Sequence, residues 1–256
     1  MTTTTLKPII CPSLLSSDFA FLARDANHML DCGADWLHMD VMFKQLSVTI
    51  TYTPIYLSFC LFFSHFVPNL TIGAPVIKSL RKHTKGHLDC HLMVTNPETL
   101  IDDFKNAGAD GITFHIEATA NRAGGVDITA DVIKKIKAAG MQCGISIKPK
   151  TPVDVLFPFL DDSVNIVDFI LIMTVEPGFG GQSFMQDMMP KVSTLRQRYP
   201  NLNIQVDGGI DPNTIGTAAQ AGANIVVAGS SLFKPGQDPK DTIQLFKDTI
   251  NKYNQH

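Results

Sequence analysis

The amino-acid sequence predicts an α/β protein folded as a single (β/α)8 TIM barrel. The chain of 256 residues has the usual length of such a barrel, about 250 residues. Its hydrophobic content of 45% is enough for one large core. Eight short apolar runs rich in β-branched residues alternate with amphipathic stretches, a pattern typical of a parallel sheet, and eight strands close a barrel.

The predicted strands and helices follow one another regularly, with one exception. The strands start near Ile9, Trp36, Leu88, Gly111, Gln142, Phe169, Asn203 and Ile225. The clearest helical patterns cover Asp18–Cys32, Pro97–Gly108, Ile128–Gly140, Met189–Tyr199, Asn213–Gly222 and Pro239–Tyr253. The interval between the second and third strands is almost twice the others, so an extra segment lies there. No internal repeat is evident, and we expect residues 1–256 to form one domain.

Composition and charge exclude several classes of protein. The formal net charge is −3 and no long basic stretch occurs, which argues against nucleic-acid binding. The five cysteines include no C-x-x-C pair and are expected to be reduced thiols. The N-terminal stretch Met1–Lys7 lacks the apolar core of a signal peptide. We therefore expect a cytoplasmic protein that does not bind membranes.

Four polar residues occur near the carboxyl ends of predicted strands, where TIM barrels carry their active sites. His38 and Asp40 are two positions apart and share one face of the second strand. His91 lies on the third strand and Asp207 ends the seventh. Imidazole and carboxylate ligands together suit one divalent Zn, Fe, Mn or Co ion. The alternative is that these are polar residues satisfied within the core.

Three glycine-rich loops follow the sixth, seventh and eighth predicted strands. They contain Gly178 to Gly181, Gly208 with Gly209, and Gly229 with Ser230. Glycine lets backbone N–H groups approach an anion closely, and barrels of this class often bind phosphate at these loops. The alternative is that the glycines only form turns. His115, Glu117 and Lys148 are interpreted as polar members of the barrel interior.

Several of these motifs resemble the ribulose-phosphate 3-epimerase family. The resemblance is carried by His38-Met-Asp-Val-Met42, His91-Leu-Met-Val94, Thr174-Val-Glu-Pro-Gly-Phe-Gly-Gly-Gln182 and Val206-Asp-Gly-Gly-Ile210. Further matches are Cys11–Asp18, His65–Thr71, Gly73–Val76 and Ala228–Ser230, so that nearly the whole chain is covered. The resemblance implies a barrel of the ribulose-phosphate-binding type.

The resemblance also implies an activity and the roles of individual residues. The reaction would be epimerisation at C3 of a ketopentose phosphate in the pentose phosphate pathway, D-ribulose 5-phosphate to D-xylulose 5-phosphate, through an enediolate. Asp40 and Asp207 would be the acid/base pair, and His38, Asp40, His91 and Asp207 the ligands of one divalent metal, with no organic cofactor. Substrate would be bound by Ser13, His91, Gly178, Phe179, Gly180, Gly181, Asp207, Gly208, Gly209, Gly229 and Ser230, under a cap of Met42, Met93 and Met173. A homo-oligomer, a dimer or a hexamer, is also expected.

Two alternative functions remain open at this point. A related epimerase that acts on a ketohexose phosphate, such as allulose 6-phosphate, would share the metal and phosphate residues. A catalytically impaired barrel that only binds phosphosugars would keep the fold but not the turnover. The second alternative depends on an unusual segment after the second strand.

Residues Phe43–Ser64, here called the insertion, stand where the family pattern has only Asp-Gly between Met42 and His65. Part of the insertion, Leu46–Phe63, is uncharged and approaches the length of a membrane span. A single span would leave the two halves of a barrel on opposite sides of the bilayer, so this interpretation is disfavoured. The insertion is otherwise a lid or partner surface, or a translated intron at a misplaced exon boundary. We favour the last interpretation and expect the segment to be irregular or poorly determined in a structure.

Overall fold

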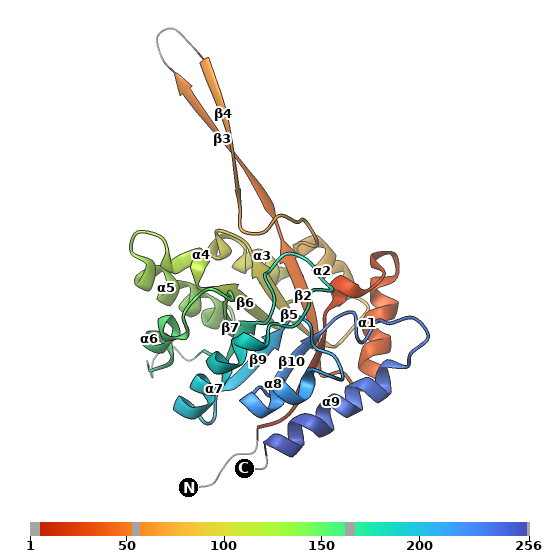
Figure 1. Ribbon diagram of the computed structural model, residues 1–256. Helices are drawn as coiled ribbons and strands as arrows, with labels where there is room; N and C mark the ends of the chain where they lie inside the picture. The colour runs from red at the N-terminus through yellow and green to blue at the C-terminus, as the bar shows by residue number, and fades with distance from the viewer. Residues whose placement is uncertain (1–5, 53–56, 162–166, 255–256) are drawn as a thin grey trace.

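Eight parallel strands form a nearly closed barrel in the computed structural model, which describes residues 6–52, 57–161 and 167–254, with the backbone alone for the described part of 44–65. Around the barrel they run β1, β10, β9, β8, β7, β6, β5 and β2, and a bridge between Ser13 and His38 joins β1 to β2 (Figure 1). The predicted (β/α)8 fold is confirmed. The strands are β1 Ile9–Pro12, β2 Trp36–Met42, β5 His87–Met93, β6 Gly111–His115, β7 Gln142–Ile147, β8 Phe169–Met173, β9 Asn203–Asp207 and β10 Ile225–Ala228.

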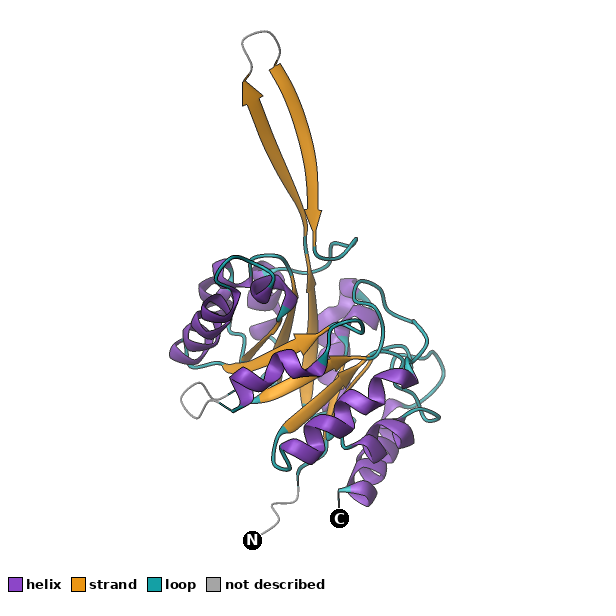
Figure 2. Cartoon of the chain, turned by 60° about the vertical axis from the view of Figure 1, so that its left-hand side comes forward, coloured by secondary structure: helices purple, strands orange, loops and turns teal. Residues whose placement is uncertain are grey.

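The helices surround this barrel and cover its outer face (Figure 2). They are α1 Leu22–Asp31, α2 Ala74–Arg81, α3 Ile101–Ala107, α4 Glu117–Ala120, α5 Gly125–Ala138, α6 Phe157–Leu160, α7 Met189–Arg198, α8 Ile215–Ala221 and α9 Pro239–Tyr253. Short 3₁₀ turns cover Leu14–Ser16, Phe19–Phe21, Pro97–Thr99, Val153–Leu156 and Gln186–Met188. Two of these turns explain why α1 and α3 begin later than their patterns predicted.

The core lies between the helices and the strands. Each strand of a parallel barrel is covered on both faces, which requires nearly continuous apolar sequence. All of β8, Phe-Ile-Leu-Ile-Met, is buried, and α5 buries Val132, Ile133 and Ile136 in the same core. The apolar runs identified in the sequence form strands here because a barrel strand is buried on both faces.

A repeated set of hydrogen bonds, the amino-terminal clasp, ties the strands together at the end of the barrel opposite the site. Four residues that directly precede β2, β6, β8 and β10 each accept the backbone N–H at the start of the neighbouring strand. The pairs are Asp35 with Ile10 at 3.0 Å, Asp110 with Leu88 at 2.8 Å, Asp168 with Cys143 at 2.7 Å, and Asn224 with Ile204 at 2.9 Å.

A cationic side chain from a surrounding helix completes each unit of the clasp. Lys247, Arg81, Lys137 and Arg196 contact Asp35, Asp110, Asp168 and Asn224 in that order. Three of the units share a sequence pattern, Gly-Ala-Asp or Gly-Ala-Asn, at 33–35, 108–110 and 222–224. These matches are only three residues long and lie at unequal spacing. Their common role is visible only in the structure, where each matched segment lies beside the neighbouring strand whose N–H group it binds.

The insertion forms a β-hairpin that projects from the carboxyl end of the barrel (Figures 1 and 2). Strand β3, Lys44–Tyr52, pairs antiparallel with β4, Leu57–His65, from Lys44 opposite His65 to Tyr52 opposite Leu57. The expected irregularity is wrong for the described backbone, because apolar and polar residues alternate along 46–51 with the period of a strand; the side chains of 44–65 and residues 53–56 lie outside the described part of the chain. Within the described ranges, no helix is long and apolar enough to cross a membrane.

We predict that loss of one cation of the clasp lowers the stability of the protein. Arg196 donates to Gly222 O at 2.7 Å and to Leu202 O at 2.7 Å, so Arg196→Met removes a charged donor from several part-buried carbonyl groups. We expect the free energy of unfolding to fall by roughly 1–3 kcal/mol, measured by urea denaturation, with kcat unchanged. The matched control is Arg198→Met, on the same helix, because the exposed ion pair of Arg198 with Asp161 should contribute little to stability. Equal effects of the two substitutions would contradict the clasp.

Candidate active site at the carboxyl end of the barrel

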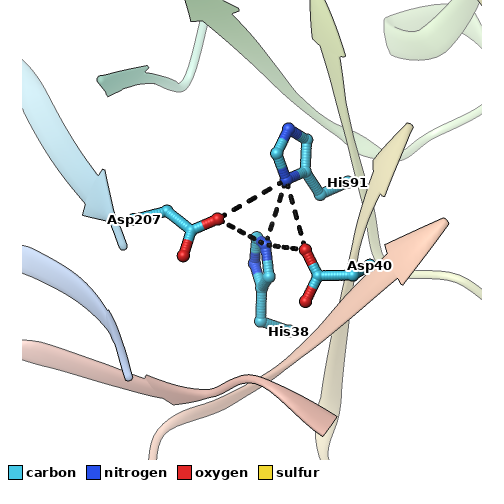
Figure 3. Close-up of side chains that lie close together, drawn as sticks. All are labelled: His38, Asp40, His91 and Asp207. Carbon is cyan, nitrogen blue, oxygen red and sulfur yellow. Dashed lines mark hydrogen bonds and ion pairs between the residues drawn. The ribbon is translucent and has the colours of Figure 1, made fainter. Parts of the chain in front are cut away.

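Four side chains from three strands point toward a common centre (Figure 3). His38 and Asp40 come from β2, His91 from β5 and Asp207 from β9, and one ligand atom of each lies within 4.8 Å of all the others. The register explains part of this arrangement, because Asp40 pairs directly with His91 between β2 and β5. The structure therefore brings together the four residues singled out in the sequence.

The spacing of these atoms fits a single metal ion. His38 Nε2 and His91 Nδ1 are 3.3 Å apart, and each lies 3.6 Å from Asp40 Oδ1 and 3.8 Å from Asp207 Oδ2. Donors arranged as a tetrahedron around an ion at about 2.1 Å would be about 3.4 Å apart. The residues present could thus hold a divalent cation with little movement.

A buried carboxylate behind the site fixes the orientation of His38. Asp89 Oδ2 lies 2.9 Å from His38 Nδ1, and Asp89 also accepts hydrogen bonds from Thr113 Oγ1 at 3.0 Å and Gln205 Nε2 at 3.2 Å. The Nδ1 proton of His38 therefore has an acceptor, which leaves Nε2 facing the cluster. The sequence analysis missed Asp89. The signal was present, because Asp89 lies two positions before His91 on the same face of β5.

The pKa values of the two carboxylates of the cluster are shifted in opposite directions. Burial and the charge of Asp40 raise the pKa of Asp207 to about 6. Burial also opposes ionisation of Asp40, but His38, His91 and a hydrogen bond from Ser13 Oγ at 2.6 Å outweigh it and lower the Asp40 pKa. Burial would lower the pKa of His38, yet Asp40, Asp89 and Asp207 raise it to about 9. One carboxylate of the pair thus keeps a proton more readily than the other.

Asp40 and Asp207 of the cluster line a cavity, whereas His38 and His91, the latter also predicted to bind substrate, are fully buried and do not line it. Ser13, Met42, Met93 and Met173 all line the same cavity. Met42 and Met93 pack with Val67, whereas Met173 packs with Leu171 and Val175. The three methionines are buried, so they give the cavity an apolar wall rather than a mobile cover.

The glycine-rich loops meet at one end of this cavity. The predicted residues Gly178, Phe179, Gly180, Gly181, Gly208, Gly209, Gly229 and Ser230 all line it, although the Phe179 side chain is 57% exposed. Gly209 has a φ of +68°, and a Cβ there would lie 2.4 Å from the backbone nitrogen of Phe184. Ser16, which the sequence analysis did not select, also lines this end, with its Oγ against Gly229.

Fold and site together define the class of protein: a (β/α)8 barrel with an imidazole–carboxylate cluster and a glycine-lined cavity at the carboxyl ends of its strands. The model of the ribulose-phosphate 3 epimerase family matches residues 9–59 and 56–233. The chain belongs to this family. The junction of the two matched segments falls inside the insertion, where the chain departs from the family pattern.

Curated relatives agree with this assignment. Ribulose-phosphate 3-epimerase, cytoplasmic isoform, of Oryza sativa subsp. japonica is 53% identical over 94% of this chain and 93% of its own length. The ribulose-phosphate 3-epimerase of Schizosaccharomyces pombe is 43% identical over 95% and 94%. That of Mycobacterium tuberculosis is 42% identical over 88% and 86%. The protein is accordingly an enzyme of the epimerase class.

Solved structures with low sequence identity share the fold. A 3-hexulose-6-phosphate synthase from Salmonella typhimurium superimposes with a TM-score of 0.63 at 15% identity, covering 96% of this chain and 99% of its own. KGPDC from Streptococcus mutans gives a TM-score of 0.64 at 15% identity, with coverages of 96% and 98%. At this identity the comparison supports the barrel architecture alone.

The raised pKa of His38 predicts how the stability of the metal-free protein depends on pH. Between pH 6.5 and about 9 the folded state keeps a proton on His38 that the unfolded state has lost. This contribution is therefore complete below pH 6.5 and is lost as the pH rises through 9, by up to about 1.4 kcal/mol per unit. Urea denaturation in a chelating buffer measures it, and His38→Gln should flatten the slope. An unchanged slope in the variant would exclude His38 as its source.

Proposed function

We propose that the protein interconverts D-ribulose 5-phosphate and D-xylulose 5-phosphate by metal-dependent, two-base proton transfer at C3. The observation that carries this proposal is the position of the two carboxylates. Asp40 on β2 and Asp207 on β9 come from strands separated by β1 and β10, and both border the same cavity. A sugar between them would present one face of C3 to each carboxylate.

The chemistry of epimerisation suits this pair. A proton is removed from C3 by one carboxylate, and the other carboxylate returns a proton to the opposite face through an enediolate. The lowered pKa of Asp40 suits the base, and the raised pKa of Asp207 suits the proton donor. The roles reverse in the opposite direction. A bound divalent cation would supply Lewis-acid stabilisation of the negative charge that develops on the substrate oxygens.

The other predicted residues have binding roles in this proposal. Ser13 orients Asp40 and contacts the sugar, and the methionines exclude water from the reacting carbons. Backbone N–H groups of the three glycine-rich loops would hold the phosphate, since such groups form anion sites where glycine permits close approach. The names of the curated relatives favour the pentose over the hexose phosphate.

Further parts of the proposal follow from the family. We place the enzyme in the cytoplasm, as the name of the rice relative suggests, and expect a homo-oligomer, a dimer or a hexamer, which light scattering would test. No organic cofactor is needed for proton transfer at a carbon beside a carbonyl group. An impaired barrel is disfavoured because the insertion leaves the four clustered residues together.

The proposal is tested by turnover in deuterated water. The intact enzyme should convert D-ribulose 5-phosphate faster than a six-carbon ketose phosphate, place deuterium at C3 of the product, lose activity with a chelator and recover with added metal. Asp40→Asn and Asp207→Asn should each lower kcat by at least about 10²-fold, because each removes an acid/base group. Ser13→Ala should have a smaller effect. Unlabelled product, or full activity in metal-free protein, would refute the mechanism.

A second prediction concerns the insertion, which we propose is dispensable. Thr71 holds the end of β2 from outside the hairpin, because its Oγ1 donates to Asp40 O at 2.5 Å and accepts from Met42 N at 3.0 Å. Lys44 and His65 are paired neighbours at the base of the hairpin, so the chain leaves and returns at nearby positions and Asp-Gly can join Met42 to His65. The hairpin also points away from the barrel in both views (Figures 1 and 2).

Replacement of residues 43–64 by Asp-Gly should therefore give a more soluble enzyme with at least equal kcat/KM. Solubility and kcat/KM are compared with those of the full chain. A substantial loss of activity would instead favour a functional lid. Mass spectrometry of the native protein provides an independent check, since peptides from 43–64 at normal abundance would contradict the intron hypothesis.

A further inference from the structure

A third histidine, His115, lies outside the cluster and next to His91. His115, the last residue of β6, is fully buried, as expected for a polar member of the barrel interior. Its Nε2 atom lies 2.9 Å from Nε2 of His91, and the two rings stack with centroids 4.9 Å apart. His91 thus turns Nδ1 to the cluster and Nε2 to His115.

A carboxylate faces the other nitrogen of His115. Glu117 Oε2 lies 3.4 Å from His115 Nδ1, and both atoms are buried without a hydrogen-bond partner in the described part of the chain. The other carboxylate oxygen, Oε1, accepts from the backbone nitrogen of Lys148 at 2.8 Å and from Thr151 Oγ1. Since unpaired buried polar atoms are costly, a proton on His115 Nδ1 would be stabilised by the facing Oε2 of Glu117.

The directions of these hydrogen bonds are coupled. Between two imidazole nitrogens 2.9 Å apart, one carries the proton and the other accepts it. A carboxylate beside His115 Nδ1 favours the proton on that atom, so that His115 Nε2 is the acceptor. His91 must then donate from Nε2, and a neutral His91 has no proton on Nδ1. Neither ring changes its protonation state in this arrangement.

We propose that His115 and Glu117 are positioning residues that fix the tautomer of His91 and so keep its Nδ1 free to bind a metal ion. The inference rests on the proposed metal-dependent function. It gives both imidazoles of the cluster a carboxylate partner. Asp89 contacts His38 directly at 2.9 Å, whereas Glu117 acts on His91 through His115. Partners of this kind orient metal-binding histidines and raise metal affinity.

The substitution Glu117→Gln tests the proposal because it can reverse the direction of the hydrogen bond between His115 and His91 while keeping the shape of the side chain at residue 117. Two donors, Lys148 N–H and Thr151 O–H, point at the Oε1 position and should hold the amide oxygen there. The amide NH₂ would then face His115 Nδ1. His115 would carry its proton on Nε2, and His91 would be left with a proton on Nδ1, against the metal.

The experiment measures zinc affinity by competition with a chromophoric chelator and the histidine tautomers by ¹⁵N NMR of the zinc-free full chain. Glu117→Gln should lower zinc affinity by about 10- to 100-fold, and should move the His115 proton from Nδ1 to Nε2. The matched control is Glu98→Gln, whose carboxylate pairs with Arg122 outside the cavity, and which should bind zinc like the unmodified protein.

The outcomes separate this inference from the proposed function. An unmodified protein that binds zinc, together with a Glu117→Gln variant that binds it equally well, would overturn the positioning role alone. The same titration is repeated with Fe²⁺, Mn²⁺ and Co²⁺, and an unmodified protein that binds none of the four ions would overturn the metal-dependent function and the role with it. A proton on Nε2 of His115 in the unmodified protein would also overturn the proposal, and this measurement does not depend on the folding of any variant.

Discussion

The parallel, in-register pairing of β2 with β5 is the constraint on which the rest of the site depends. It sets Asp40 beside His91 and His38 beside Asp89, so one register supplies three residues of the cluster and the carboxylate that orients His38. A shift of one residue would turn every side chain of the strand to the opposite face. Closure of the barrel then places Asp207 of β9 at the same centre.

The barrel divides stability and chemistry between its two ends. At the amino ends of the strands, the clasp pairs each of its carboxylate or amide groups with a strand N–H group and a cation. At the carboxyl ends, the charge of Asp40 raises the pKa of Asp207, an unfavourable pairing that the proposed mechanism would use for proton transfer. The hydrogen bonds of the clasp join neighbouring strands and so stabilise the barrel that carries this site.

The insertion illustrates how tolerant the loops at the carboxyl end are. Hairpin strands β3 and β4 leave and re-enter at neighbouring positions, and Thr71 bonds to both Asp40 and Met42 just beyond the point of return. Asn69 donates to Gly178 O at 2.8 Å and ties the same segment to the glycine-rich loop after β8. Loops attached at such paired positions can lengthen without moving the strands that carry the site.

Local patterns in the sequence were enough to predict the eight barrel strands, most of the longer helices and the four clustered residues, because periodicity and the position of a residue at a strand end are local properties; the hairpin strands β3 and β4 were not predicted. His38 and Asp40 could be assigned to one face from their spacing alone. The roles of Asp89, His115 and Glu117, and the repeated clasp, were decided only by the tertiary structure. Each depends on which strands are neighbours and in what register, and neither the short pattern of the clasp nor the position of Asp89 on the face of His91 names the partner across the barrel.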